Sequence, residues 1–321
     1  MLVRIAPHLT AGRPPRGEVS EVVQKRNRAA AGTDTPNWGR SRSSVRPPGG
    51  AGRGILARMA SSRVALTLDG PVAHVVLARP EARNAFDAAM VRELHDAVAA
   101  ASARDDIRVI VLAGRGPVFS AGADVEWMKT VAGFTPEENL ADALALADLF
   151  ETIDRSPKAV MACIQGAALG GGAGLVAVAD VAVAEATAQF GFTEVRLGLV
   201  PAVISPYVVR KIGVSAAREL FLTGERFTAA RAAAIGLVHR VVKPAELDAA
   251  ADERVRELLQ AAPGAVTAAK ALVRAVAGRP VESVRELVCE HIAERRASAE
   301  GQEGLRAFLE KRKPDWDGVR S

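Results

Sequence analysis

Cysteine is almost absent from the sequence. The 321 residues contain two, Cys163 and Cys289, which is too few for a disulfide framework and gives no reason to expect an oxidising compartment. The five histidines are scattered, and none lies at zinc-site spacing from a cysteine, so we expect no metal. No run of about 18 apolar residues occurs, so we expect no transmembrane helix and no membrane partner. These absences favour a cytoplasmic protein.

Acidic residues are scarce near the N-terminus. Residues 1–58 hold 11 lysines and arginines but only 3 acids, a net charge of +8 in a chain whose total is +5. The remainder is therefore mildly acidic, which argues against a nucleic-acid partner for the folded part. Because residues 1–58 also hold 8 glycines and 6 prolines and show almost no apolar periodicity, we expect this basic segment to be disordered.

Three explanations of the basic segment compete. Its richness in arginine and lack of acids are typical of a transit peptide. It also has the charge of a nucleic-acid-binding arm, although Trp38 is its single aromatic residue. The third explanation is that translation starts at Met59, directly before the first strand-like pattern, so that residues 1–58 are not part of the native protein. We favour the third explanation.

Strand and helix patterns alternate along the rest of the chain. Residues 64–68 and 72–77 are strand-like, and the Asp69-Gly70 pair between them predicts a hairpin. Apolar residues spaced four apart from Phe86 to Val98 predict a helix. The alternation indicates an α/β fold. Further strands are predicted at residues 109–112, 159–164 and 181–184, and further helices from Thr135, at residues 166–179 after a glycine-rich turn, and from about residue 205 to a charged last helix at 304–312.

Two turns rich in small residues each follow a predicted buried strand. They are residues 119–124 and 168–174. A turn that enters a helix presents free N–H groups, so two such turns side by side offer two donors to one oxygen, as in an oxyanion hole for a thioester enolate. Close packing of helix against strand is the alternative explanation of the glycines. Neither turn has the pattern of a Rossmann or Walker loop, which disfavours nucleotide binding of those kinds.

In this order and spacing, five motifs resemble the enoyl-CoA hydratase/isomerase family, also called the crotonase superfamily, over about residues 62–316. The resemblance implies an α/β spiral of β-β-α turns over residues 59–255, followed by a helical region over residues 256–321 that forms trimers, usually paired into hexamers. It implies an acyl-CoA thioester as substrate, a homotrimer or homohexamer, and no cofactor. The motifs are residues 79–85, 119–124, 166–172, 189–191 and 308–313.

The resemblance also assigns candidate site residues. It maps the oxyanion hole onto the backbone N–H groups of Ala123 and Gly171. Alternative roles are a solvated loop charge for Arg83, helix packing for Phe308 and a solvated helix face for Lys311. The residues implied in substrate and CoA binding are Arg83, Ala85, Ala121, Gly122, Ala123, Asp124, Val125, Glu126, Gly170, Gly171, Phe308 and Lys311.

The sequence carries one of the two glutamates that family hydratases use. The second maps onto Glu194, for which a structural salt bridge with Arg196 is the alternative role. The first is replaced by Gly174, which has no side chain and is no base. A single carboxylate at the position of Glu194 is the arrangement of the family's 3,2-enoyl-CoA isomerases. Hydration with one glutamate requires another residue, or the substrate itself, to help activate water.

A second departure favours hydration. Residues 202–208 replace a glycine-rich stretch and look like a bacterial subgroup assigned as methylglutaconyl-CoA or related branched-chain hydratases. Glu138 and Asp142 are candidate replacement acids, although exposed helix charges are the commoner role, and Arg196 is a candidate partner for a distal carboxylate. We expect Tyr207 to pack rather than to donate. The first choice is hydration of a 2-enoyl-CoA, with isomerisation and non-catalytic acyl-CoA binding as alternatives.

Overall fold

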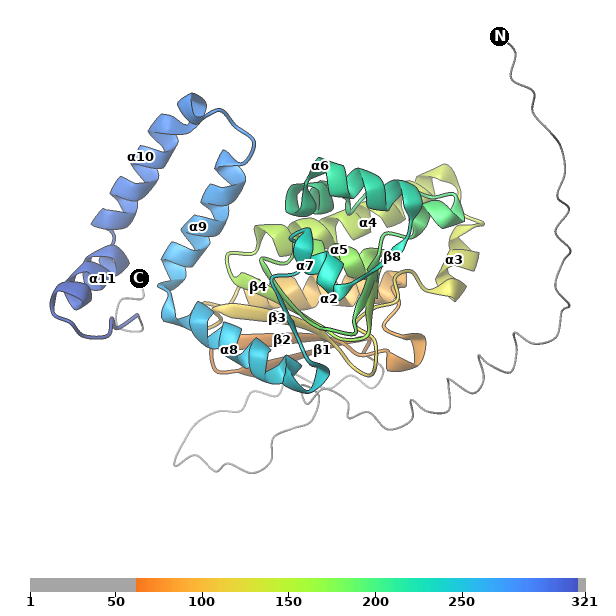
Figure 1. Cartoon of the computed structure of the whole chain (residues 1–321), viewed down its shortest axis with the longest axis horizontal. Coiled ribbons are helices and arrows are strands. Elements are labelled where there is room, and N and C mark those ends of the chain that lie inside the picture. Colours follow the sequence, from red (N-terminus) through yellow and green to blue (C-terminus); the bar gives the residue numbers. More distant parts are fainter. Residues whose placement is uncertain (1–61, 317–321) are drawn as a thin grey trace, which may run out of the picture. The chain divides into compact units, whose positions relative to one another are not determined.

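The computed structural model describes residues 62–316 (Figure 1). The expectations for residues 1–58 and for Met59 as the start of the protein fall outside this range. No helix in the described part is long and apolar enough to cross a membrane. The cytoplasmic location stays a prediction.

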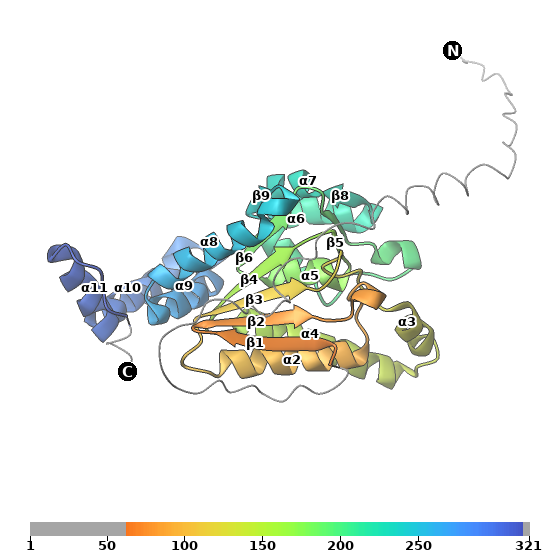
Figure 2. The same cartoon turned by 90° about the horizontal axis from the view of Figure 1, so that it is seen from below.

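A six-stranded sheet forms the centre of the fold (Figure 2). The predicted hairpin is confirmed, because β1 (Val64–Asp69) pairs antiparallel with β2 (Val72–Leu77) and Asp69 lies opposite Val72. Gly70 has a φ of +53°, which suits glycine in this tight turn. The remaining strands run parallel, in the order β3 (Val109–Gly114), β4 (Ala159–Ile164), β6 (Val181–Glu185) and β9 (Arg240–Val242).

Alternate residues of the central strands face two different layers of helices. Ile110 and Leu112 lie in the larger apolar cluster, which includes residues of α2 (Ala88–Ser102) and α4 (Pro136–Arg155). Val109 and Val111 lie in a second cluster with α8 (Leu247–Gln260). Side chains alternate with a period of two along a strand, and a parallel sheet is covered on both faces, which explains why these strands are apolar throughout.

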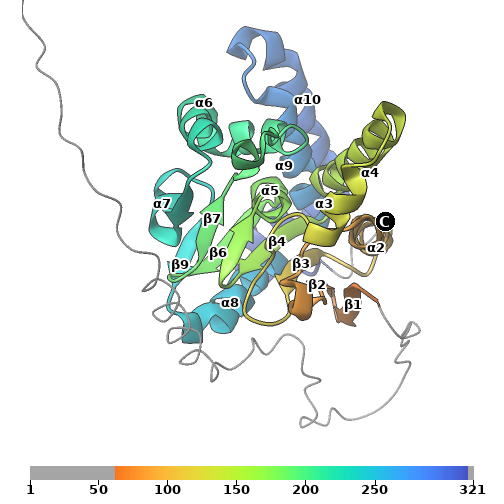
Figure 3. The same ribbon diagram turned by 90° about the vertical axis from the view of Figure 1, so that its right-hand side faces the viewer.

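A second, three-stranded sheet carries one wall of the site. Its order is β5 (Ala167–Leu169), β7 (Gln189–Gly191) and β8 (Arg226–Thr228). The sequence interpretation of residues 166–179 as a turn and a helix was therefore incomplete, because β5 precedes α5 (Gly171–Val178). Strands of three residues are too short to show a period of two in sequence. In Figure 3, α5 lies near the centre of the view and α6 (Ser205–Thr223) lies above it.

The helices at the C-terminal end bury few side chains within the chain. Those of α9 (Pro263–Val276) are all at least partly exposed, and α10 (Val281–Ala297) buries Val284 alone among its described residues.

The bounds of the last helix were predicted wrongly at residues 304–312. It is α11 (Ala299–Leu309), because the Ser298 hydroxyl accepts the Gly301 N–H and caps a helix that starts earlier. Between β9 and α9 the chain also forms α8, and α7 (Ala229–Ala234) precedes β9.

Candidate active site

The two turns predicted to come together do lie side by side. Ser120 forms a parallel bridge with Ala168, and the Leu169 N–H donates to the Ser120 carbonyl over 3.0 Å. A Cβ on Gly122 would lie 3.0 Å from the Leu169 carbonyl oxygen, and one on Gly170 would lie 3.7 Å from the Gly122 Cα. Gly122 and Gly170 also have φ of +92° and +50°. Glycine is therefore needed at both positions, for close approach and for conformation.

Each turn leaves a backbone donor unused. Gly171 is the first residue of α5, where the N–H has no acceptor within the helix. Ala123 lies between Gly122 and Asp124, whose backbone groups bond to Phe86. Among the hydrogen bonds of residues 62–316, the N–H groups of Ala123 and Gly171 find no acceptor in the chain. The turns therefore hold two unsatisfied donors.

The Glu194 carboxyl group lies against the second turn. Glu194 begins the short helix η3 (Glu194–Leu197), and its Oε1 lies 3.3 Å from the position of a Cβ on Gly170. Its Oε2 is buried and has no hydrogen-bond partner in the described chain. Burial raises the pKa of this carboxyl group above its usual range.

The salt bridge considered for Glu194 is not formed. The side chain of Arg196 is exposed and runs past Gly224, where a Cβ would lie 3.1 Å from the Arg196 Cγ. None of the ion pairs in the described range includes Glu194. A half-buried acid with no ion-pair partner and one buried oxygen without a hydrogen bond is a candidate for a role in chemistry.

A stability measurement tests this environment. Because the folded state raises the pKa of Glu194, its charged form is disfavoured there, and the penalty appears as pH rises above the unfolded pKa. We expect Glu194→Gln to raise the melting temperature by about 2–4 °C at pH 7.5, a stabilisation on the order of 1 kcal/mol, and to leave it unchanged at pH 4. If Glu194→Gln and the wild type have the same melting temperature at pH 7.5 as well as at pH 4, the carboxylate of Glu194 carries no such penalty in the folded state. Exposed Glu137→Gln serves as the matched control.

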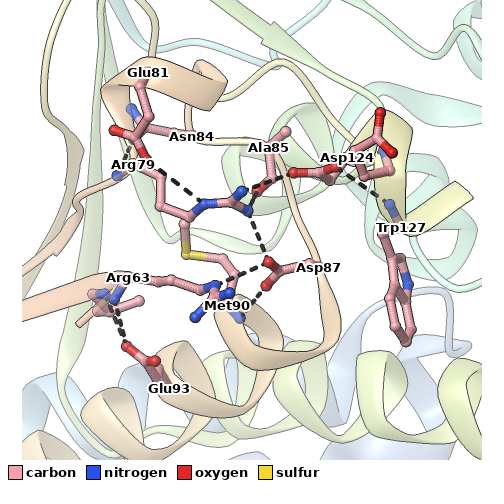
Figure 4. Close-up of polar contacts among 12 residues, drawn as sticks. Arg63, Arg79, Glu81, Asn84, Ala85, Asp87, Met90, Glu93, Asp124 and Trp127 are labelled. Carbon is pink, nitrogen blue, oxygen red and sulfur yellow. Dashed lines mark hydrogen bonds and ion pairs between the residues drawn. The ribbon is translucent and has the colours of Figure 1, made fainter. Parts of the chain in front are cut away.

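A network that sequence inspection missed holds the first turn (Figure 4). The Arg79 guanidinium donates to Asp87 and to Asp124, both over 2.9 Å. Asp124 also accepts the N–H groups of Glu126 and Trp127 and so caps α3 (Val125–Val131). Burial acts to raise the pKa of Asp124, but these N–H groups and Arg79 outweigh it and hold the pKa below its usual range. These contacts therefore hold Asp124, the residue that follows Ala123, in a fixed position.

Asn84 ties the same loop to the sheet. It is fully buried with a φ of +53°, and its Oδ1 accepts the Arg79 N–H over 2.9 Å. Its Nδ2 donates to the carbonyl groups of Arg115 and Val118. Both amide ends are satisfied, which fixes the loop between residues 79 and 84 against the end of β3.

The other residues implied in CoA binding fall into two groups. Near the turns, Arg83 is exposed at a φ of +53°, and Ala85 is buried with its carbonyl accepting Arg79. Ala121 donates its N–H to Arg83, Val125 is exposed, and Glu126 pairs with Lys129 over 2.7 Å. Phe308 and Lys311 are exposed near the end of α11, which lies opposite α3 in Figure 1. One chain alone does not bring the two groups together.

The candidate replacement acids lie on α4. Glu138 is exposed, and its Oε2 accepts the Thr135 N–H in the predicted capping box. Asp142 is half-buried, and burial raises its pKa although the Trp127 side chain bonds to it. Both line a cavity of about 300 Å³ between α2 and α4. Tyr207 stacks on Phe150 with ring centroids 5.7 Å apart, so it packs as predicted.

Comparisons with known proteins agree with this geometry. A family model described as enoyl-CoA hydratase/isomerase matches residues 68–319. A Thermus thermophilus protein whose name is that of an enoyl-CoA hydratase is 38% identical to this chain over 245 residues, which are 76% of this chain and 97% of the relative's own length. Carnitinyl-CoA dehydratase of Salmonella typhi is 35% identical over 266 residues, 80% of this chain and 99% of its own. A solved enoyl-CoA hydratase structure from Shewanella pealeana has a TM-score of 0.77 at 41% identity, covering 79% of this chain and 96% of that one.

The fold is thus that of the crotonase superfamily, a class of enzymes with a helical C-terminal region. The chain belongs to the enoyl-CoA hydratase/isomerase family.

Proposed function

We propose that the chain hydrates a 2-enoyl-CoA at the site formed by the two turns and Glu194. The observation that carries the proposal is the position of a carboxyl group, without an ion-pair partner and with its Oε2 free of hydrogen bonds in the described chain, beside a turn with an unused N–H donor. The names of the relatives, enoyl-CoA hydratase and carnitinyl-CoA dehydratase, support it. No cofactor is needed for this reaction, and that expectation stays a prediction.

In the proposed reaction the thioester oxygen accepts the N–H groups of Ala123 and Gly171. The Glu194 carboxylate takes a proton from water, whose oxygen bonds to the β-carbon while the π electrons move to the thioester oxygen. Collapse of the enolate then takes the proton from Glu194 to the α-carbon, so that one water is added in all. The two N–H groups hold the enolate more tightly than the ground-state carbonyl, because its oxygen carries more negative charge.

For the acyl group we propose a branched substrate of the methylglutaconyl type. The proposal rests on residues 202–208 and on Arg196, whose exposed side chain belongs to the same short helix as Glu194. A guanidinium group binds a carboxylate through two parallel N–H donors, which suits a substrate with a distal carboxylate.

Isomerisation of a 3-enoyl-CoA is the second candidate, and glycine at position 174 favours it. In that reaction Glu194 removes a proton from the α-carbon and returns it to the γ-carbon, and no water takes part. One carboxylate is sufficient for both transfers.

The ultraviolet band of the conjugated thioester separates these functions. We would follow it with the full chain and with unbranched 2-enoyl-, 3-enoyl- and 3-methylglutaconyl-CoA. Loss of the band with a 3-hydroxyacyl product establishes hydration, and appearance of the band from the 3-enoyl substrate establishes isomerisation. Binding with no change of the band in either direction contradicts both.

We further propose that α9, α10 and α11 assemble the chain into a homotrimer or homohexamer. Several large apolar side chains on these helices are exposed in the single chain, and Phe308 is 81% exposed. Phe308 and Lys311 would then complete the CoA site of a neighbouring subunit. The exposed residues include Val273, Val281, Ile292, Leu305, Phe308 and Leu309.

Truncation of Phe308 tests this assembly. We expect Phe308→Ala to raise KM about tenfold, since burial of a phenylalanine against a ligand or neighbour contributes on the order of 1.5 kcal/mol. Its melting temperature at low protein concentration should not fall, because the side chain buries little in the single chain. KM and mass by light scattering are the measurements. Exposed Arg306→Ala on the same helix is the control, and equal KM values for both variants would exclude the role of Phe308.

A further inference from the structure

The place beside Gly174 is already filled by another side chain. Gly174 lies one turn into α5, where its N–H donates to the Gly170 carbonyl over 2.9 Å. A Cβ built on Gly174 would lie 2.4 Å from the Cγ2 of Ile204 and 3.1 Å from its Cβ. It would also lie 2.9 Å from the Cζ of Phe150. Contacts under 3.0 Å do not occur for real Cβ atoms, so any side chain here requires its neighbours to move.

The neighbours are held in place. Ile204 is 3% exposed and Phe150 is fully buried. Phe150 stacks on Tyr207, and the Ile204 carbonyl accepts the Val208 N–H at the start of α6. Ile204 is therefore the residue whose nearest atom blocks position 174.

The turn that carries Ile204 is itself fixed. The Ser205 hydroxyl and N–H both donate to the Ala202 carbonyl, over 2.8 and 3.1 Å. Pro206 follows in the first turn of α6. The glycine at 174 and the altered residues 202–208, which are two separate departures in sequence, thus form one packing unit in the structure.

We propose that Ile204 limits the site to a single acid–base group, because it occupies the space beside Gly174 and excludes a second carboxylate there. Glu194 is then left as the acid–base group next to the turns. This rests on the proposed function, which gives Glu194 its role. It adds that the restriction to one carboxylate is imposed by the residue that directly precedes α6 and not by the loss of a glutamate alone.

Melting temperatures of full-chain variants test the packing. We expect Gly174→Ala to lower the melting temperature by about 5 °C through overpacking, and by less than half of that in an Ile204→Ala background. Ile212→Ala is the matched background, since Ile212 on α6 is also buried but is not among the atoms close to position 174. If Gly174→Ala costs the same in the wild-type, Ile204→Ala and Ile212→Ala backgrounds, the proposal is wrong.

Turnover tests the chemistry. We expect Gly174→Glu combined with Ile204→Ala to hydrate an unbranched 2-enoyl-CoA at least about tenfold faster than Ile204→Ala alone, while Gly174→Glu combined with Ile212→Ala shows no gain. A double variant that melts like Ile204→Ala but gains no rate would overturn the chemical part. If the wild-type chain turns over no acyl-CoA, the proposed function fails and the chemical part fails with it. The melting cycle still decides separately whether Ile204 blocks position 174.

Discussion

Replacing Glu194 by glutamine should lower kcat by about a thousandfold, within the range usual for a general acid–base group. The carboxylate is the only group next to the turns that we assign to proton transfer, so the variant loses both proton steps. The affinity for a non-reactive acyl-CoA should change little, because the proposed thioester donors belong to the backbone of Ala123 and Gly171. Single-turnover rates and calorimetric titration with a saturated acyl-CoA measure the two quantities.

Two controls separate this role from the alternatives. Glu138→Gln keeps the capping box, since glutamine also serves at that position, and Asp142→Asn keeps the size of the side chain. A loss in either variant comparable to that of Glu194→Gln would assign the chemistry to α4.

In the wild type, kcat/KM should fall as pH falls through the raised pKa of Glu194, at a pH above the usual 4.5 of a glutamate. A profile flat down to pH 4.5 would rule out Glu194 as the base.

Removing the Asp124 side chain should have the largest effect on stability. The side chains of Arg79 and Asp124 are 19% and 11% exposed, so Asp124→Ala leaves a largely buried guanidinium with one partner fewer and removes the cap of α3. We expect a loss of about 3 kcal/mol, or about 6–12 °C in melting temperature. We also expect kcat/KM to fall about 100-fold, because a shift of the turn moves the Ala123 donor. Thermal melting and steady-state kinetics provide the measurements.

Asp124→Asn divides this effect into its parts. Asparagine is as good a helix cap as aspartate, so this variant keeps α3 and loses the charge pairing with Arg79. Its melting temperature and its kcat/KM should lie between those of the wild type and those of Asp124→Ala. Glu126→Ala removes an exposed pair with Lys129 and should cost no more than about 0.5 kcal/mol. If Asp124→Ala melts like Glu126→Ala, the network is not what holds the turn.

The sequence was informative where a feature is local. The hairpin at Asp69-Gly70, the capping box at Thr135 and five of the six strands of the central sheet depend on neighbouring residues, and each was predicted correctly. The sixth strand, β9, was missed, because the chain from about residue 205 onward was interpreted as helical and a three-residue strand shows no period of its own. The two glycine-containing turns were also found, because small residues after an apolar strand leave a recognisable pattern. The family resemblance, which depends on several motifs in order, predicted the fold.

Features that depend on contacts between distant segments were missed. The pairing of Arg79 with Asp124 joins residues that no periodicity relates, and the three-residue strands of the second sheet are specified by their partners. The contact of Ile204 with Gly174 is of the same kind. The sequence showed both departures but suggested opposite functions for them, because their packing is visible only in three dimensions.

The unused donors in the two turns belong to the main chain, and this has a consequence for how such a site changes over generations. A point mutation cannot delete a backbone N–H unless it introduces proline, which lacks that hydrogen. Most substitutions of Ala123 or Gly171 themselves thus leave the N–H groups proposed to bind the substrate oxygen in the chain, whereas a single nucleotide change can replace the side chain of Glu194, Ile204 or Arg196. Under the proposed function, a change of reaction or of acyl group therefore requires new side chains only, and the binding of the thioester oxygen by the main chain is retained.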